Sequence, residues 1–493
     1  MTITEKPKTR SAEIRASLDY PVIDCDAHLR EFIPLLEEYI EKVSDKSYAQ
    51  RHVSHVYAGL PRPKTMPLEE RQQWQAMQGA FWGTTMDDLD DYVTQIVPNR
   101  LYERLEDFGT DFAIVYPSHG LSLNTIEDDD LRRAVIRGLN QMNSELYNRE
   151  FGYRIHVPAI LPMHTPEEAI AELDYIVNVQ GFKAVAIPPG ITRPIPGLEE
   201  KYPGISTHAP DGLWVDRFGI DSQYDYDPVW EKFIELRVAV TCHGALMPSF
   251  PKLSRSISNY TFNHVRNQPS MQEQLCKAFY MGGVSRRFPQ LNFAFMEGGV
   301  AYACNLLSDV VGHWEKRNRQ ALEHVNPANL DRQTAYEMMV KSGGNKYDQG
   351  SAEATFQAVF SVCGDVPAEL DDFAAMKIEK KEDFKTLFSN FYFGCEADDR
   401  MTAHAFNTKT NRFGMKLKPI LSSDIGHFDV VDMEKVLEEA YENVEYDVVS
   451  PEDFRAQVAE NPVLLHGGMN PDFFKGTAVE GWATEVLTKS ASR

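Results

Sequence analysis

The sequence lacks the features that would place it among membrane or nucleic-acid-binding proteins. No apolar run reaches the about 18 residues that a membrane-spanning helix needs. Basic residues are scarce, with 50 Lys and Arg against 73 Asp and Glu, so the formal net charge is −23. Such a surface repels nucleic acids and anionic membranes, and we therefore expect neither as a partner.

Cysteine is also sparse, and its pattern does not suggest pairing. The six cysteines include no Cys-x-x-Cys motif, and Cys25, Cys242 and Cys395 lie inside apolar runs. This favours buried free thiols in a reducing compartment over disulfides or a zinc knuckle. Residues 1–19 are polar and lack the apolar segment of a secretory signal, so we expect a frayed tail or arm there, in a cytoplasmic protein.

What the sequence does contain is a series of short apolar segments, most of them continuous rather than alternating. Continuous apolar segments are typical of parallel strands that are covered on both faces. We predict eight strands, at Val22–His28, Phe112–Pro117, Val157–Pro162, Ala184–Pro188, Val238–His243, Leu291–Glu297, Phe391–Glu396 and Ile420–Asp424.

Helix start signals follow several of these segments. Thr165 suits an N-cap, Pro166 suits the first helical position, and Glu168 completes a capping box. Asp227-Pro228 opens a second helix in the same way. Strands that alternate with helices imply an α/β fold with a parallel sheet, and eight such units imply a closed (β/α)8 barrel of the TIM type.

Three long insertions interrupt the alternation, and each follows a predicted strand. They span residues 30–107, 245–289 and 323–388, so we expect them at the carboxyl face of the barrel, where loops build and cover active sites. We predict a tail over residues 1–19 and a single barrel domain over residues 20–493. The first insertion contains residues that fit a lid or subunit contact as well as local packing: Trp74, Met77, Phe81, Trp82 and Met86.

Polar residues end four of the predicted strands, where the mouth of the barrel should lie. Asp26 and His28 are two residues apart in the first strand, so their side chains point to one face, and Glu31 can fold back over them. The fifth, sixth and eighth strands also end in a histidine or an acidic residue. Converging carboxylates repel one another unless a cation lies among them. The pattern therefore predicts a metal site formed by Asp26, His28, Glu31, His243, Glu297 and Asp424.

These residues lie in segments through which the chain resembles the amidohydrolase-related branch of the amidohydrolase superfamily. The resemblance covers most of the chain outside the insertions and depends on the combination of segments rather than on one motif. It implies a metal-dependent enzyme that acts on a small-molecule substrate. The matching segments are Val22–Glu31, His164–Pro189, Asp227–Gly244, Met281–Val300, Ser423–His427 and Asn461–Phe474.

The resemblance also implies roles for residues beside the metal. We expect Asp424 to serve as ligand and proton shuttle, and His427, three residues later, to orient water or contact the substrate. His119 follows the second strand and faces the predicted mouth, where it either binds substrate or belongs to the loop structure.

The sequence departs from the commonest pattern of this family at two places. Asp26-x-His28, followed by Glu31, replaces the usual His-x-His, and Glu297 stands where many decarboxylase relatives have a histidine. Four carboxylates with two histidines is the ligand set of dinuclear iron or manganese sites. A single zinc ion needs fewer ligands and suits a nitrogen-rich set. A branch of the superfamily uses dinuclear iron or iron–manganese centres for oxygen-dependent hydroxylation.

Two activities are therefore open, and a third reading comes from another class of protein. The first is a hydrolase or decarboxylase that activates water for attack on a small carboxylate- or carbonyl-bearing substrate. The second is a monooxygenase that uses the same ligands. The third, a non-catalytic subunit on a barrel scaffold, would show a degraded ligand set, which this chain does not. We expect one or two divalent ions per chain, zinc or iron/manganese, and a homo-oligomer, in the simplest case a dimer.

Overall fold

The computed structural model describes residues 8–58, 66–74, 87–208, 212–244, 256–360, 371–427 and 429–492. The chain divides into two compact units. The first contains Met1–Asn305 and Lys385–Arg493, and the second contains Leu306–Phe384. All strands of the described residues belong to the first unit, so the candidate site is a property of that unit.

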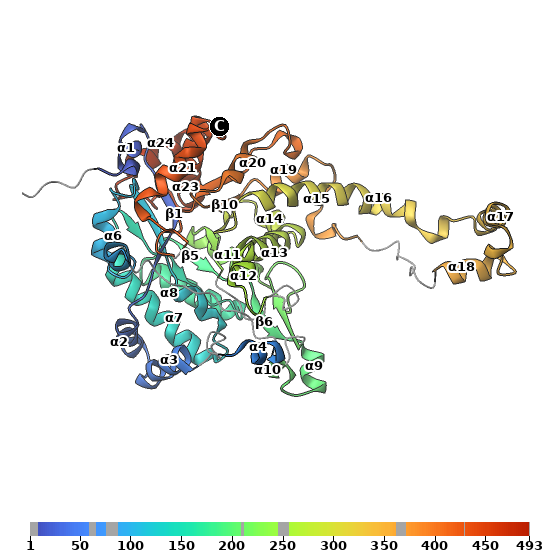
Figure 1. Cartoon of the computed structure of the whole chain (residues 1–493), viewed down its shortest axis with the longest axis horizontal. Coiled ribbons are helices and arrows are strands. Elements are labelled where there is room, and N and C mark those ends of the chain that lie inside the picture. The colour runs from blue at the N-terminus through green and yellow to red at the C-terminus, as the bar shows by residue number, and fades with distance from the viewer. Residues whose placement is uncertain are drawn as a thin grey trace, which may run out of the picture. The chain divides into compact units, whose positions relative to one another are not determined.

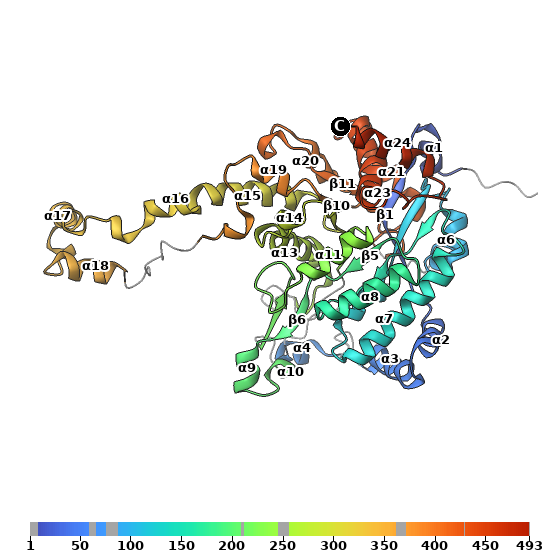
Figure 2. The ribbon, with the colours of Figure 1, turned by 180° about the vertical axis from the view of Figure 1, so that it is seen from behind.

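Strands form at the positions of all eight predicted ones (Figures 1 and 2). Two short strands replace the third, because the residues between them, Val157 and Pro158, join neither pairing. Nearly every strand residue is buried, as expected for strands covered on both faces. The strands are β1 (Ile23–Leu29), β2 (Phe112–Pro117), β3 (Ile155–His156), β4 (Ala159–Ile160), β5 (Val185–Ile187), β8 (Val240–Cys242), β9 (Phe293–Phe295), β10 (Phe391–Cys395) and β11 (Lys418–Leu421).

These strands pair in parallel, in the orders β1-β2-β3 and β4-β5-β8-β9-β10-β11. Among the described strands, no ladder joins β11 to β1, but backbone bonds connect the segment after β11 to β1. The His28 N–H donates to the Ile425 carbonyl at 2.7 Å, and the Asp424 N–H donates to the Asp26 carbonyl at 2.8 Å. The predicted α/β architecture with parallel sheets is confirmed. These backbone bonds bring β1 and the segment after β11, which are far apart in the sequence, to one place.

Helices pack on the outside of the strands. α7 (Asp129–Asn143) and α8 (Pro166–Asn178) lie side by side in both views, and α11 (Asp227–Leu236) packs against α8 (Figures 1 and 2). Further helices of the first unit include α9 (Pro196–Lys201), α10 (Ile205–His208), α12 (Tyr260–His264), α13 (Asn267–Met281), α14 (Val284–Arg287), α20 (Ala403–Phe406), α22 (Pro451–Arg455), α23 (Asn461–Gly467) and α24 (Glu480–Ala491).

Thr165 begins α8 as predicted, but the expected capping box does not form. The Thr165 hydroxyl accepts a hydrogen bond from the Glu168 N–H at 3.2 Å. The Glu168 carboxylate receives the guanidinium of Arg132 on α7 instead, at 3.0 Å. Both charged side chains are buried, and a charge-assisted bond is stronger than the local bond of a capping box.

The first insertion is helical in its described parts. It contains α2 (Ile33–Val43), α3 (Lys46–Ala58), α4 (Leu68–Trp74), α5 (Leu89–Thr94) and α6 (Pro98–Arg104), and α2 packs on α7. The residues of the suggested lid or subunit contact fall at its centre. Trp74 ends α4, whereas the others lie outside the described residues: Met77, Phe81, Trp82 and Met86.

An antiparallel strand pair that the sequence did not indicate follows β5. β6 (Ile191–Pro194) pairs with β7 (Leu213–Asp216). The Arg193 guanidinium lies 2.7 Å from the Asp216 carboxylate, and both side chains are buried. A buried ion pair between distant positions leaves no periodic hydrophobic signal, which is why sequence patterns missed this element.

Part of the predicted N-terminal tail is a helix, α1 (Arg10–Ser17). The Thr9 hydroxyl accepts the Ala12 N–H at 3.1 Å, and Ile14 is buried. α1 packs against α21 (Val436–Glu445), whose Glu438 N–H donates to the Ser11 hydroxyl at 3.1 Å (Figures 1 and 2). A polar sequence with one buried stripe is stabilised here by tertiary packing rather than by helix propensity.

The second unit is helical in its described residues. It contains most of α15 (Ala301–Arg317), then α16 (Arg319–Leu322), α17 (Arg332–Gly343) and α18 (Ala352–Phe360), and the start of α19 (Asp383–Leu387). The Trp314 and Phe384 rings pack edge to face at 5.8 Å, and Arg317 pairs with Asp372 at 2.8 Å.

The expectation of free thiols agrees with the structure wherever a cysteine is described. Cys25, Cys242, Cys276 and Cys395 are buried free thiols, Cys304 is half-buried and free, and Cys363 lies outside the described residues. None of the described helices has both the length and the apolar character required to cross a membrane.

A buried arginine of the first insertion pairs with a buried aspartate and also contacts the C-terminal part of the first unit, which predicts a large mutational effect. Arg104 on α6 is 2% exposed, and its guanidinium lies 2.6 Å from Asp91 and 3.0 Å from Glu434. Arg104→Ala leaves the buried Asp91 carboxylate without its cation, so we expect a loss of about 3–5 kcal/mol in unfolding free energy, measured by urea unfolding.

Arg100→Ala on the same helix is the matched control. Arg100 pairs with Asp90, and both side chains are more than one third exposed. Solvent screens this pair, so we expect the control to cost less than about 1 kcal/mol. Equal losses in the two variants would contradict a dominant role for the buried pair.

Two buried histidines predict that the fold weakens in acid. Burial lowers the pKa of His156 and of His466 to about 3. Between about pH 6.5 and pH 3 the unfolded chain binds more protons than the folded chain. The contribution of the two neutral histidines to the unfolding free energy is therefore present above this range and is lost as the pH falls through it. Each histidine should lower the unfolding free energy by about 2 kcal/mol as the pH falls from 7.5 to 5.

The His466→Phe variant isolates this effect, because the His466 ring stacks on Phe473 at 4.5 Å and a phenyl ring can replace it. We expect the variant to lose less unfolding free energy than the wild type between pH 7.5 and pH 5, measured by urea unfolding. An unchanged pH slope would show that the folded chain protonates His466 without cost.

Candidate metal centre

The candidate centre begins at the carboxyl end of β1. Asp26 and His28 lie two residues apart in this strand and are 0% and 1% exposed, so strand alternation places their side chains on one face. Their neighbours Cys25, Ala27 and Leu29 belong to the hydrophobic clusters that fix the strand. Apolar burial of the strand therefore determines where the two polar side chains point.

His243 brings a second imidazole to the same point from the end of β8. Its Nε2 lies 3.2 Å from Asp26 Oδ1 and 3.2 Å from Nε2 of His28. Its Nδ1–H donates to the Gly244 carbonyl at 3.0 Å, which leaves the Nε2 lone pair facing the other two side chains. Asp26, His28 and His243 thus offer three ligand atoms that lie within 4.8 Å of one another.

Asp424 forms a second such group with His28 and His427. Its Oδ1 lies 3.2 Å from Nε2 of His28 and 2.8 Å from Nδ1 of His427. The rings of the two histidines stack, with centroids 3.7 Å apart. The Ser118 hydroxyl, which the sequence did not indicate, lies 3.1 Å from Nε2 of His427. His28 is therefore shared by both groups, and Ser118 continues the second one.

Glu297 approaches from the segment after β9. The side chain is 4% exposed, and its Oε2 lies 3.6 Å from Nε2 of His243. Its φ of 53°, like the φ of 59° at Asp424, is in the left-handed region that non-glycine residues seldom adopt. Two acidic residues held in this conformation at one centre favour a functional constraint on both.

Burial and charge separate the carboxylates of the centre into two kinds. Burial opposes ionisation of Asp26 and Asp424, but the adjacent histidines outweigh it and lower the pKa of both. Burial also opposes the charged form of His28, but its two carboxylate neighbours raise its pKa to about 10. Glu297 gains no such compensation, since burial and the charges of Asp424 and Asp26 raise its pKa far above the ordinary value.

The donor set fits a divalent metal ion. Three buried oxygens, Asp26 Oδ1, Glu297 Oε2 and Asp424 Oδ1, accept no hydrogen bond of normal geometry from the described residues. Buried anionic oxygens without hydrogen bonds are costly unless a cation compensates them. Oxygen and imidazole nitrogen are the ligands that zinc, iron and manganese bind in proteins.

Three further polar residues hold Asp26 in place. The Ser422 hydroxyl donates to Asp26 Oδ2 at 2.7 Å, which leaves Oδ1 directed at the histidines. Asp24 accepts the N–H groups of Asp26 and Ser423, each at 3.1 Å, and the Ser423 hydroxyl. Sequence reasoning missed Asp24, although Asp24, Asp26 and His28 recur at every second position of β1 and could have revealed it.

Glu31 is buried but lies in neither group of converging ligands. Its Oε2 accepts the His119 N–H at 2.9 Å, and its Oε1 accepts the Gly120 N–H at 2.7 Å. Burial raises its pKa to about 7, and these two backbone bonds oppose the rise. The structure thus gives Glu31 a contact with the loop after β2, and its assignment as a metal ligand stays a prediction.

His119 lies in the same loop, where the sequence placed a substrate-binding candidate. Its Nε2 is 2.9 Å from Nε2 of His52, a buried residue of α3. His52 comes from the first insertion, so this pair joins the insertion to the loop that contacts Glu31. Sequence patterns could not find His52, because a histidine inside a helical segment has no distinguishing spacing.

Comparison with known proteins adds three solved structures and a family. The chain is similar to an amidohydrolase from Mycobacterium avium subsp. paratuberculosis K-10, with 16% identity, a TM-score of 0.52, and 92% of this chain and 100% of that chain covered. It is also similar to a dihydroxybenzoic acid decarboxylase from Polaromonas sp. JS666 with bound manganese. The identity is 14% and the TM-score 0.49, and 91% of this chain and 97% of that chain are covered. A third similar structure is a 5-carboxyvanillate decarboxylase from Novosphingobium aromaticivorans DSM 12444, also with bound manganese. The identity is 12% and the TM-score 0.49, and 94% of this chain and 99% of that chain are covered.

At 16% identity the Mycobacterium avium structure indicates the fold alone. No curated protein matches the chain. The family model described as amidohydrolase matches residues 23–354, which is more than half of the chain. The matched residues include Asp26, His28, His243 and Glu297, whereas Asp424 and His427 lie beyond them. This match confirms the family that the sequence resemblance indicated, and the chain belongs to the amidohydrolase family.

Proposed function

We propose that the chain is a metal-dependent enzyme that activates water for hydrolysis or C–C cleavage of a small carboxylate- or carbonyl-bearing substrate. One observation carries the proposal: Asp26, His28 and His243 converge as buried ligand atoms, with Asp424 and Glu297 beside them. A divalent ion held by these residues would polarise a substrate carbonyl and lower the pKa of water.

We also propose that the two parallel sheets form one closed (β/α)8 barrel. β3 and β4 belong to one continuous segment that pairs with β2 on one side and β5 on the other. The bonds from His28 to Ile425 and from Asp424 to Asp26 connect the remaining edges. The converging side chains would then lie at the carboxyl mouth of this barrel.

The residues around Asp424 offer a route for a proton. Its carboxylate is kept ionised by its two histidine neighbours and can accept a proton at Oδ1. His427 lies next along the route, with Nδ1 2.8 Å from Asp424 and Nε2 3.1 Å from the Ser118 hydroxyl. We assign Asp424 as general base and His427 as the residue that orients it or relays the proton.

The position of Glu31 favours hydrolytic chemistry over oxygen activation. Both of its carboxylate oxygens accept backbone N–H groups, which favours a centre held by one carboxylate fewer than the sequence suggested. Asp26, His28, His243 and Asp424 suffice for a single ion. A dinuclear monooxygenase is the second candidate, and the observation in its favour is the unbonded Glu297 Oε2 beside His243.

Replacing His243 tests the ligand assignment. His243→Ala removes one of three converging ligand atoms, so we expect metal affinity to fall by more than the roughly 10–100-fold that a lost outer-shell contact costs. Metal content per chain is measured by mass spectrometry on protein purified without added metal, and folding by circular dichroism. His404→Ala, at an exposed histidine of α20, is the control and should keep its metal. Full occupancy in the His243 variant would remove the assignment.

Replacing Glu297 separates the two candidate activities. For a single ion held by Asp26, His28, His243 and Asp424, Glu297→Gln should leave the metal content at about one per chain. For a dinuclear site the wild type should hold two ions and the variant about one. Metal analysis of both proteins decides between these outcomes. A loss of one ion, with iron or manganese in the wild type, would favour the monooxygenase.

A further inference from the structure

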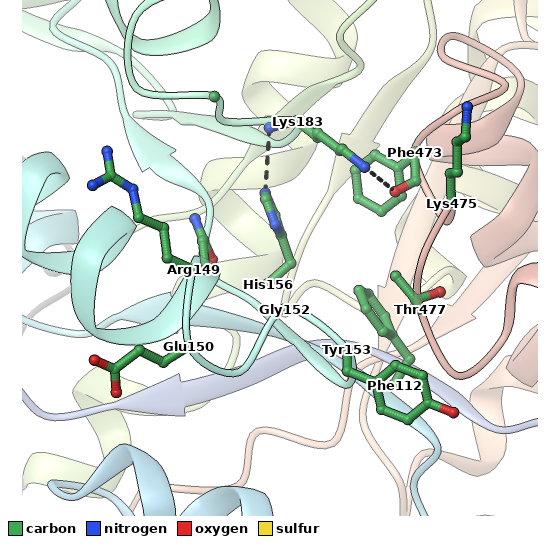
Figure 3. A pocket seen from close by; sticks show the side chains of 12 residues that line it. Phe112, Arg149, Glu150, Gly152, Tyr153, His156, Lys183, Phe473, Lys475 and Thr477 are labelled. Carbon is green, nitrogen blue, oxygen red and sulfur yellow. Dashed lines mark hydrogen bonds between the residues drawn. The ribbon is translucent and has the colours of Figure 1, made fainter.

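A cavity of about 430 Å³ lies at the opposite end of the strands from the candidate metal centre (Figure 3). Phe112 begins β2, His156 pairs with Ile114 near the start of β2, and Lys183 stands just before β5, so the cavity adjoins the amino ends of β2 and β5. The metal ligands lie at the carboxyl ends. The cavity is therefore separate from the site of the proposed reaction.

Three cationic side chains line this cavity, Arg149, Lys183 and Lys475, against a single acidic one, Glu150. This balance is unusual in a chain with a net charge of −23. None of the described acidic side chains lies within ion-pair distance of Arg149. Figure 3 shows Arg149 on one side of His156, with Lys475 and Thr477 on the other. Lys475 Nζ lies 3.7 Å from the Asp472 carboxylate, so the positive charge on that side is partly balanced, whereas the charge of Arg149 is not.

Lys183 joins the cavity wall to the C-terminal part of the chain. Its ammonium group donates to the carbonyls of Asp472 and Phe473, each at 2.9 Å. Figure 3 shows the bond to Phe473. An ammonium group has three donors, so one remains for a ligand. The two carbonyls fix the position of the ammonium group without neutralising its charge.

His156 adds a buried neutral donor to the wall. It is 8% exposed, and its Nε2 accepts the Lys183 N–H at 3.4 Å (Figure 3). Burial first, and then the charge of Lys183, lower its pKa to about 3, so the ring is neutral and carries its proton on Nδ1. Within the described residues, no acceptor takes this N–H, which makes it available to a ligand in the cavity.

We propose that this cavity binds a small oxyanion, the phosphate or carboxylate group of a small molecule, through Arg149, Lys183, Lys475 and the His156 N–H. Charge-assisted bonds to phosphate or carboxylate are the strongest hydrogen bonds that these side chains make. The bound anion would tie three segments together, residues 148–156, Lys183 and residues 473–477. It would therefore stabilise the docking of the C-terminal segment on the amino ends of the strands.

Calorimetric titration of the full chain with inorganic phosphate, and with succinate as the carboxylate probe, tests the proposal at constant ionic strength. Arg149→Ala with Lys475→Ala should weaken binding by at least about tenfold, because two cations are lost. Lys409→Ala with Arg412→Ala removes the same charge from exposed positions elsewhere and should leave binding unchanged. No binding to the wild type, or equal weakening in both double variants, would overturn the proposal.

A second arm distinguishes this cavity from the metal centre, which could itself bind phosphate. The His243→Ala variant should bind the anion as the wild type does, because the cavity does not include His243. Loss of binding in that variant would place the anion at the metal centre and overturn the proposal. In wild-type protein, the imidazole NMR signals of His156 should shift on titration while those of His404 stay unchanged.

Discussion

The centre depends on the burial of carboxylates against imidazoles at the carboxyl end of β1. Asp26 and His28 are almost fully buried, and their side chains are stabilised by each other and by side chains from distant parts of the chain. Such a group is costly to assemble, since each charge loses its hydration. The surrounding fold must therefore supply many apolar contacts and well-placed donors, and the hydrogen bonds of Ser422 and Ser423 are examples.

The same constraint explains the backbone between β11 and α21. Asp424 adopts a left-handed conformation, and its N–H and the next carbonyl bond to β1. Gly426 has a φ of 97°, and a Cβ there would lie 2.4 Å from the His28 carbonyl oxygen, so only glycine permits this close approach. The segment thus presents Asp424 and His427 to His28 at the cost of one unfavourable backbone conformation, at Asp424, and of a strict requirement for glycine at position 426.

The two ends of the strands have opposite chemistry. Asp26, Glu297 and Asp424 gather at the carboxyl end, where the histidines lie among them. Arg149 and Lys183 lie at the amino end, beside a cavity with polar walls. In amidohydrolase-family chains built on parallel strands, chemistry at the carboxyl end leaves the amino end to stability. An anion there would act through the docking of the C-terminal segment rather than through the reacting atoms.

The amino-acid sequence by itself determined the strand positions, the parallel α/β class and the family, together with Asp26, His28, His243 and Glu297 as residues of the centre. Continuous apolar segments and polar residues at strand ends are local signals, which is why the sequence alone reveals them. It predicted Glu31 as a metal ligand, but it could not reveal that both carboxylate oxygens accept the N–H groups of His119 and Gly120. Likewise Ser118, His52 and the β6–β7 pair became visible only in three dimensions. Their partners are tens to hundreds of residues away, and no local spacing encodes such contacts.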